Sequence, residues 1–169
     1  MTTFTELGLV APLLQVLEAR EHDTPTPVQS AAIPAVLKNR DVWAQAQTGS
    51  GKTAAYVLPI LQNFHEPHAT SPRGVLILVP TRELAAQVGA TFTEYARYLS
   101  NSLKIVTVHG GVSINPQMMK LRGRADVVVA TPGRLLDLVE KNAFKLSTVS
   151  LLVLDEADRL LDLGFSEEL

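Results

Sequence analysis

The protein has 169 residues, a length typical of a single domain. Hydrophobic residues make up 46% of the sequence, but no apolar run approaches the roughly 20 residues of a membrane span, so we predict a soluble protein with no membrane partner. The absence of cysteine excludes disulfides and cysteine-ligated zinc, and the polar N-terminus lacks the features of a signal peptide, which together favour a cytoplasmic location. The net charge of −2 means that any contact with RNA or DNA must be local.

Two helices are predicted before residue 40. Residues 12–20 and the segment that starts at Pro27 both have helical apolar spacing and a proline suited to a first turn, with a break at residues 24–27. Gln29 lies in the second helix, where its amide could match the donor and acceptor edge of adenine or could simply be solvated. Phe4 stands alone upstream, as a terminal core anchor would.

Residues 44–53, Ala-Gln-Ala-Gln-Thr-Gly-Ser-Gly-Lys-Thr, lie between an apolar pair, Val42 and Trp43, and an apolar stretch of helical character. The order strand, tight loop and helix is the setting that a phosphate-binding loop requires. Gly49 and Gly51 allow backbone conformations that a β-carbon would forbid, so successive N–H groups can surround an anion at the positive end of the helix.

The last two residues of this loop supply the rest of the chemistry. Lys52 can reach the terminal phosphates of a nucleotide, and Thr53 can ligate Mg²⁺. The strict pattern has a glycine where this chain has Ala46. The short sequence Gly-Ser-Gly-Lys-Thr also fits a plain turn followed by a helix N-cap, an alternative that the flanking strand and helix argue against.

The rest of the chain alternates between short apolar strands and helices. Four more strands are predicted at residues 74–79, 104–108, 126–130 and 151–154. Helices are predicted from the candidate N-cap Thr81 to about residue 99, at 115–122, along the apolar stripe at 135–139, and at 159–163. Because the strands are almost uniformly apolar, we predict an α/β fold whose parallel sheet is covered on both faces.

Polar turns with glycine or proline follow most of the predicted strands. In parallel sheets, ligands gather at the carboxyl ends of the strands, so these turns predict a site at one edge. After the last strand, Asp155 could hold Mg²⁺ through its water shell, and Glu156 could polarise a water for in-line attack on a terminal phosphoryl group. Either carboxylate alone could be a surface acid or a helix cap, but together with the phosphate loop they indicate nucleotide hydrolysis.

Six segments, in this order, resemble the motifs of the first RecA-like domain of DEAD-box ATP-dependent RNA helicases. They are residues 24–29, 46–53, 80–85, 110–111, 131–134 and the sequence Asp155-Glu156-Ala157-Asp158. The resemblance extends along essentially the whole chain. It implies that residues 1–169 form a three-layer RecA-like P-loop domain with a mainly parallel β-sheet, which binds ATP and Mg²⁺ and acts on single-stranded or duplex RNA.

The resemblance also implies roles in nucleotide binding. Gln29 would contact the adenine edge, and Phe4 would support that loop. The family usually has a glycine and then an aromatic residue where this chain has Glu21 and His22; His22 can still stack on adenine, with less apolar area. Catalytic roles are implied for Lys52, Asp155 and Glu156, and metal binding for Thr53 and Asp155. The nucleotide-binding set is Phe4, His22, Gln29, Gln47, Thr48, Gly49, Ser50, Gly51, Lys52 and Thr53.

Contacts to RNA are implied for residues at the strand ends. Backbone N–H groups at helix starts and a few guanidinium groups can hold phosphates without reading bases, which is compatible with an acidic net charge. Taken one at a time, each residue could also be a plain helix cap or turn. The RNA-binding set is Pro80, Thr81, Arg82, Gly110, Gly111, Thr131, Gly133 and Arg134.

By the same resemblance, the domain is incomplete at its C-terminal end. The family has a further strand between the phosphate-loop strand and the Asp155 strand, ending in a Ser-Ala-Thr motif that contacts Asp158, and then a second RecA-like domain. Only eleven residues follow Asp158, too few for a crossover and a strand. We therefore expect the gap to be filled by strand exchange with another chain, by a rearranged segment or by residues outside this chain, and we expect little ATP turnover.

Two alternatives remain open: a non-catalytic RNA-binding or scaffolding module, and a related P-loop DNA helicase.

Overall fold

The computed structural model describes residues 2–65 and 74–165. These residues form two compact units. The described residues of the first unit lie within Met1–Ser71 and Phe92–Ser102, and those of the second within Pro72–Thr91 and Leu103–Leu169. Among the described residues, no helix combines the length and the apolar character needed to cross a bilayer.

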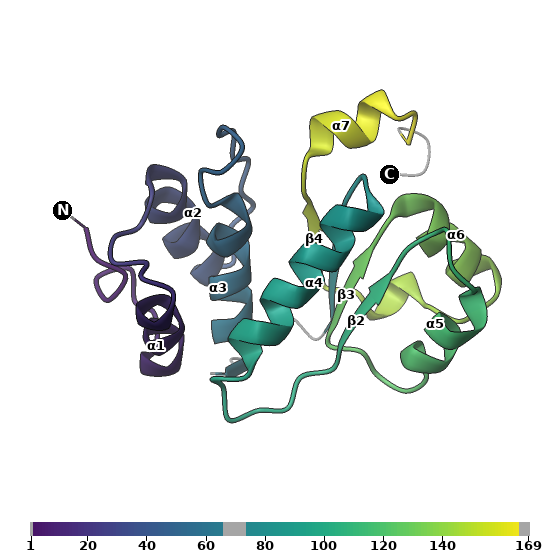
Figure 1. Cartoon of the computed structure of the whole chain (residues 1–169), viewed down its shortest axis with the longest axis horizontal. Helices are drawn as coiled ribbons and strands as arrows, with labels where there is room; N and C mark the ends of the chain where they lie inside the picture. The colour runs from purple at the N-terminus through teal and green to yellow at the C-terminus, as the bar shows by residue number, and fades with distance from the viewer. Residues whose placement is uncertain (1, 66–73, 166–169) are drawn as a thin grey trace. The chain divides into compact units, whose positions relative to one another are not determined.

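The first unit is built from helices (Figure 1). They are α1 (Ala11–Ala19), α2 (Pro27–Leu37), α3 (Lys52–His65) and the C-terminal part of α4 (Arg82–Ala96). The predicted helices are confirmed, although α4 ends three residues before the predicted position. At the start of α2, the Thr26 hydroxyl accepts from the Gln29 backbone N–H and the Gln29 side chain accepts from the Thr26 N–H, which is a capping box. At the C-terminal end of α1, the Arg20 guanidinium lies 2.7 Å from the Glu94 carboxylate of α4.

The predicted strand at Val42 and Trp43 is wrong. Residues 40–47 have no regular secondary structure, and Trp43 is 89% exposed. A strand needs a neighbour to pair with its N–H and C=O groups, and this segment has no place in the one sheet formed by the described residues. Two apolar residues beside a phosphate loop therefore did not specify a strand by themselves.

The sheet of the second unit has four parallel strands in the order β2-β3-β1-β4 (Figure 1). The strands are β1 (Val75–Leu78), β2 (Ile105–Val108), β3 (Val127–Ala130) and β4 (Leu151–Leu154). The last residues of all four strands pair in register, Val108 with Ala130 and Leu78 with both Ala130 and Leu154. The turns that follow therefore begin at one edge of the sheet, as the sequence predicts.

Helices cover both faces of this sheet, which confirms the predicted α/β fold with a parallel sheet between helical layers. One face packs against α5 (Ile114–Leu121), α6 (Pro132–Glu140) and α7 (Ala157–Asp162), which contribute Leu121, Leu138 and Leu160 to a core with the strand residues. On the other face, the N-terminal part of α4 lies against β2, since a β-carbon on Gly89 would overlap the side chain of Thr107. A short 3₁₀ helix, Leu146–Thr148, precedes β4.

Strand β4 is at the edge of the sheet and departs from the predicted uniform burial. Leu152 is 52% exposed and Leu154 is 40% exposed, whereas their partners in β1, Leu76 and Leu78, are buried. Paired residues of parallel strands share a face, so the apolar core face continues onto exposed leucines at this edge. Edge position alone does not explain this, because β2 is the other edge strand and its Val106 and Val108 are buried; the exposure shows that little of the described chain covers this face over β4.

Over residues 2–65 and 74–165, four helices end with the same backbone turn, in which the second residue past the helix has a positive φ. These residues are Glu21 (φ 56°), Asn39 (φ 52°), Asn142 (φ 53°) and Gly164 (φ 87°). At each, two backbone N–H groups return to carbonyl groups of the last turn, as in a Schellman motif. Glycine adopts this conformation without strain and asparagine tolerates it, so Glu21 is the strained member of the set.

Candidate functional site

The phosphate loop, in the first unit, has the backbone shape that its glycines predict. Gly49 has a φ of +78° and Gly51 a φ of +85°, both in the left-handed region that favours glycine. The Ser50 hydroxyl is buried and has no hydrogen-bond partner among the described residues. A buried hydroxyl of this kind calls for a partner, and a bound phosphate would supply one.

The charged group of the loop is the ammonium of Lys52. Its Nζ donates a hydrogen bond of 2.6 Å to the carbonyl oxygen of Ala46, so the cation lies against the loop itself. Lys52 is also the first residue of α3, where the helix dipole favours an anion. Thr53 follows in the same turn, and Gln47 and Thr48 are exposed on the loop. These donors fit nucleotide phosphates, and the threonine hydroxyl fits a hard cation such as Mg²⁺.

Gln29 connects helix α2 to the phosphate loop. It is 3% exposed, and its Nε2 donates to the carbonyl oxygen of Gly51 over 3.2 Å. A β-carbon on Gly51 would overlap this amide nitrogen, so the close approach requires glycine. The interpretation of Gln29 as a solvated residue is therefore wrong, while its contact with adenine stays a prediction.

The other predicted adenine-side residues differ in burial. Phe4 is 4% exposed, which confirms it as a core anchor near the terminus. His22 is exposed, and its backbone N–H donates to the Leu17 carbonyl over 2.9 Å at the end of α1. The positive φ of Glu21 explains why a glycine suits this position. The roles of Phe4 and His22 in adenine binding stay predictions.

In the second unit, the two predicted carboxylates follow β4 directly. Asp155 is 8% exposed, and its N–H continues the strand pairing by donating to the Leu78 carbonyl over 3.0 Å. Glu156 is the N-cap of α7 with φ 51° and ψ 50°, and its carboxylate lies 3.4 Å from the Arg159 guanidinium. A left-handed backbone at a glutamate costs on the order of 1–3 kcal/mol, and such strain concentrates at functional sites. The strained backbone at Glu156 therefore favours a functional role.

The turns after β1 and β2 bring together two of the predicted RNA-binding segments. After β1, Pro80 is buried and the Thr81 hydroxyl accepts from the Leu84 N–H over 3.2 Å, which confirms Thr81 as the cap of α4. Arg82 is exposed, yet its guanidinium reaches Gly111, where a β-carbon would overlap Nη1. Gly111 has a φ of +80°, so this turn requires glycine for both its conformation and its contact.

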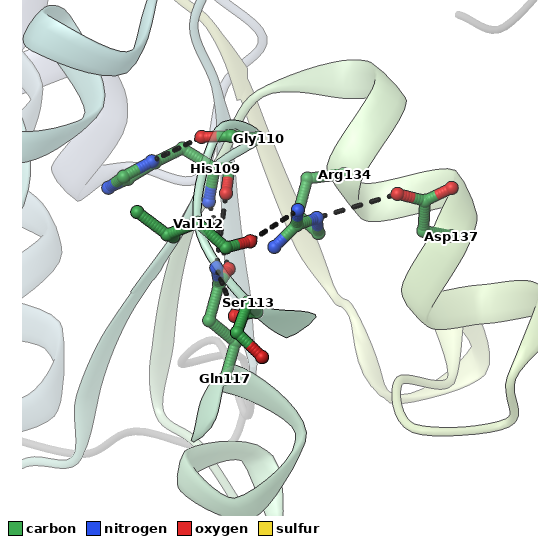
Figure 2. A network of polar contacts seen from close by, with 7 residues as sticks. All are labelled: His109, Gly110, Val112, Ser113, Gln117, Arg134 and Asp137. Atoms are coloured by element: carbon green, nitrogen blue, oxygen red, sulfur yellow. Dashed lines mark hydrogen bonds and ion pairs between the residues drawn. The ribbon is translucent and has the colours of Figure 1, made fainter. Parts of the chain in front are cut away.

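Arg134, from the turn after β3, supports the same region from within (Figure 2). Its side chain is only 9% exposed, and Nη2 donates to the Val112 carbonyl over 2.9 Å. Nε lies 3.4 Å from the Asp137 carboxylate without hydrogen-bond alignment, and Nε and Nη1 are buried without hydrogen-bond partners among the described residues. Thr131 is the N-cap of α6, and Gly133 is exposed in its first turn. Arg134 is therefore a buried cation with unused donors rather than a freely solvated one.

One residue of this region, Gln117, has no role predicted from the sequence. It lies within the predicted helix at 115–122, is 6% exposed in α5, and hydrogen-bonds the backbone of His109 and Ser113 (Figure 2). The sequence carried only a weak indication that Gln117 is buried. It lies three residues after Ile114 and four before Leu121, which places it on the helix face that packs against the core.

The sequence as a whole matches known proteins. The model of the DEAD/DEAH box helicase family matches residues 26–169. The "ATP-dependent RNA helicase DeaD" of Escherichia coli is 46% identical over 167 residues, which are 99% of this chain and 26% of that protein. The "ATP-dependent rRNA helicase RRP3" of Pyricularia oryzae is 51% identical over 164 residues, which are 96% of this chain and 30% of that protein. The chain thus spans about a quarter to a third of the length of these relatives.

Solved structures with the same fold agree with the sequence match. A DEAD box protein from Methanococcus jannaschii superposes with a TM-score of 0.88 at 36% identity, over 99% of this chain and 45% of that chain. The RNA helicase Prp28 from Chaetomium thermophilum, bound to ADP, gives a TM-score of 0.86 at 41% identity, over 99% of this chain and 41% of that chain. Because the family match covers most of the sequence and the fold agrees with it, the chain belongs to the DEAD/DEAH box helicase family.

Proposed function

We propose that this chain is the ATP-binding and RNA-binding core of an ATP-dependent RNA helicase, in which ATP binding and hydrolysis are coupled to holding single-stranded RNA and opening short duplexes. The names of its relatives support this proposal. The observation that carries it is the phosphate loop, where two positive-φ glycines precede a lysine whose ammonium lies against the loop at a helix start.

On the nucleotide side, each residue has one proposed task. Lys52 binds the terminal phosphates, and Gln29 fixes the adenine edge while keeping its contact with the loop. Thr53 and Asp155 would hold Mg²⁺, Asp155 through water, and Glu156 would polarise the attacking water. When bound, Mg²⁺ would neutralise the charge that develops on the phosphate oxygens.

On the RNA side, the contacts are to phosphates. Exposed Arg82 is suited to hold a strand without reading its sequence, and Arg134, whose unused donors are buried, would reach a phosphate after its side chain turns outward. Thr131, Gly133 and the turn at Gly110–Gly111 would add contacts from the same edge of the sheet. The relatives are three to four times longer than this chain, so we propose that a second RecA-like domain completes the RNA clamp and the ATPase site. We also propose that the protein acts in the cytoplasm.

The test is a titration of the chain with a fluorescent adenine nucleotide, competed by ATP or GTP, with and without single-stranded RNA. We expect competition by ATP and not by GTP, and tighter nucleotide binding when RNA is present. RNA binding without nucleotide binding would instead favour a scaffolding module. If single-stranded DNA replaced RNA with equal effect, the chain would be better described as part of a DNA helicase.

A further inference from the structure

Gln117 is a buried polar residue whose placement the proposed catalytic roles do not explain. It lies on the inward face of α5 and is 6% exposed, beside the apolar core that includes Leu121. Burying an amide is unfavourable unless its donors and acceptors are paired, so the partners of Gln117 indicate what the residue does.

Those partners all belong to one loop, residues 109–113. The Gln117 Oε1 accepts from the His109 N–H over 3.0 Å, and its Nε2 donates to the carbonyls of His109 over 3.1 Å and Ser113 over 3.3 Å (Figure 2). His109 is the first residue after β2. Because it pairs with both the N–H and the C=O of His109, the Gln117 side-chain amide acts as one more peptide unit beside strand β2. Its bond to the Ser113 carbonyl also closes the far end of the loop.

The loop that is closed in this way carries the Gly110–Gly111 turn. The His109 ring adds a contact, since Nδ1 lies 2.9 Å from the Gly110 carbonyl; a carbonyl can only accept, so Nδ1 carries the proton. Within the described part of the chain, no protein group accepts from the N–H of Gly110 or Gly111. Adjacent N–H groups in a turn with a positive-φ residue can bind an anion, and the Arg82 guanidinium lies at Gly111.

We propose that Gln117 is a positioning residue for RNA binding: it holds the 109–113 loop so that the N–H groups of Gly110 and Gly111 and the guanidinium of Arg82 face one RNA phosphate together. This inference rests on the proposed RNA-binding function of the same turn. Gln117 itself does not contact RNA in this arrangement. Its effect comes from three hydrogen bonds, not from its volume.

The chain offers a matched control for the substitution Gln117→Leu. Gln62 is also buried, at 9% exposure, and also bonds backbone groups of a loop, accepting from the Val10 N–H over 3.0 Å and donating to the Gly8 carbonyl over 2.7 Å. It belongs to the first unit, whereas the RNA-binding set belongs to the second. Gln62→Leu therefore removes the same kind of interaction without touching the 109–113 loop.

Two measurements on the folded chain decide the proposal. The first is NMR relaxation of the backbone amides, in which Gln117→Leu should lower the order parameters of Gly110, Gly111 and Val112 more than those of the strands β2 and β3. The second is affinity for a single-stranded oligouridylate. If the loop is correctly arranged only about a tenth of the time in this variant, the apparent affinity should fall roughly tenfold, with nucleotide affinity unchanged. Gln62→Leu should lower stability without changing either readout.

A measurement on the unsubstituted chain covers the case in which Gln117→Leu does not fold. RNA should shift the NMR signals of the Gln117 side-chain amide, since a phosphate bound at Gly110 and Gly111 would polarise the adjoining backbone groups that Gln117 pairs with, and should leave those of Gln62 unchanged. Equal effects of Gln117→Leu and Gln62→Leu, or a Gln117 amide that does not respond to bound RNA, would overturn the proposal. If the unsubstituted chain bound no RNA, the proposed function would fail, and unchanged order parameters of the loop in Gln117→Leu would separately refute the positioning role.

Discussion

Two glutamates in the described part of the chain have a left-handed backbone, and their surroundings differ. Glu21 follows the end of α1, where the left-handed conformation lets backbone N–H groups bond to carbonyl groups of the last turn. A residue that adopts this conformation without strain would make the protein more stable. Glu156 follows β4 and begins α7, at the edge where the predicted catalytic carboxylates lie. At Glu21 we therefore expect glycine to raise the stability. At Glu156 we expect the strain to be retained because the function requires the carboxylate.

Replacing Glu21 by glycine should raise the free energy of unfolding by about 1 kcal/mol, because glycine adopts a positive φ without the clash of a β-carbon. Thermal or urea denaturation measures the change. Asn142→Gly is the matched control, because Asn142 occupies the same position in the turn after α6 and asparagine already tolerates this conformation. Equal effects at the two positions would contradict the explanation.

Lys52→Ala and Glu156→Gln should separate binding from hydrolysis. Loss of the ammonium should weaken ATP binding, because Lys52 is proposed to contact the ground-state phosphates. The glutamine variant should bind ATP almost normally and lose hydrolysis in a longer, active form. Fluorescent-nucleotide titration and phosphate release measure the two properties. If both variants lost binding to the same extent, these roles would be wrongly assigned.

Arg82→Ala and Arg134→Ala should both weaken RNA binding, but only the second should destabilise the fold. Arg82 is exposed, so its removal should reduce affinity for all sequences alike and lower the salt slope by about 1. Arg134 also donates to the Val112 carbonyl, so its removal should cost roughly 1–3 kcal/mol of stability as well. Losses that depend strongly on RNA sequence would show that these arginines do not contact phosphates.

At the scale of helices and strands, the sequence predicted those elements whose pattern is local. Strands β1 to β4 and the helices between them follow from apolar runs and caps such as Thr81. The strand at Val42 was wrong because a strand also depends on a neighbour, which no local pattern supplies. The exposure of Leu152 likewise depends on tertiary cover, which no local pattern supplies. Gln117 was missed because its partners are backbone groups, which carry no signal in the sequence.

The packing of α4 on β2 gives a prediction of this scale. Gly89 lies inside a helix, where alanine would normally be favoured by about 1 kcal/mol, but a β-carbon there would overlap Thr107. We expect Gly89→Ala to lower the unfolding free energy by about 1–3 kcal/mol through overpacking. Combining it with Thr107→Ala should recover most of that loss in a double-mutant cycle. Additive losses would mean that the two residues do not meet.

At the scale of the whole molecule, the candidate residues divide between the two units. The RNA-binding turns and the carboxylates meet at one edge because four parallel strands end in register, and this arrangement was predictable from the order of strands and turns. The phosphate loop lies in the first unit with Gln29. The family resemblance, rather than any local pattern, assigned these residues to a single ATPase site.

The last prediction concerns a longer form of the protein. In the part of the chain that the structure describes, strand β4 presents exposed leucines and has no partner strand on one side, and the chain spans only about a quarter to a third of the length of its relatives. A form extended through a second RecA-like domain should unfold at a higher temperature, because each buried backbone group that gains a partner contributes about 0.5–1.5 kcal/mol. It should also hydrolyse ATP when RNA is added, whereas the 169-residue chain should stay near background. The extended form with Glu156→Gln separates the two effects, since it should keep the added stability and lose the activity. Equal stability and equal hydrolysis in the short and extended forms would contradict the prediction.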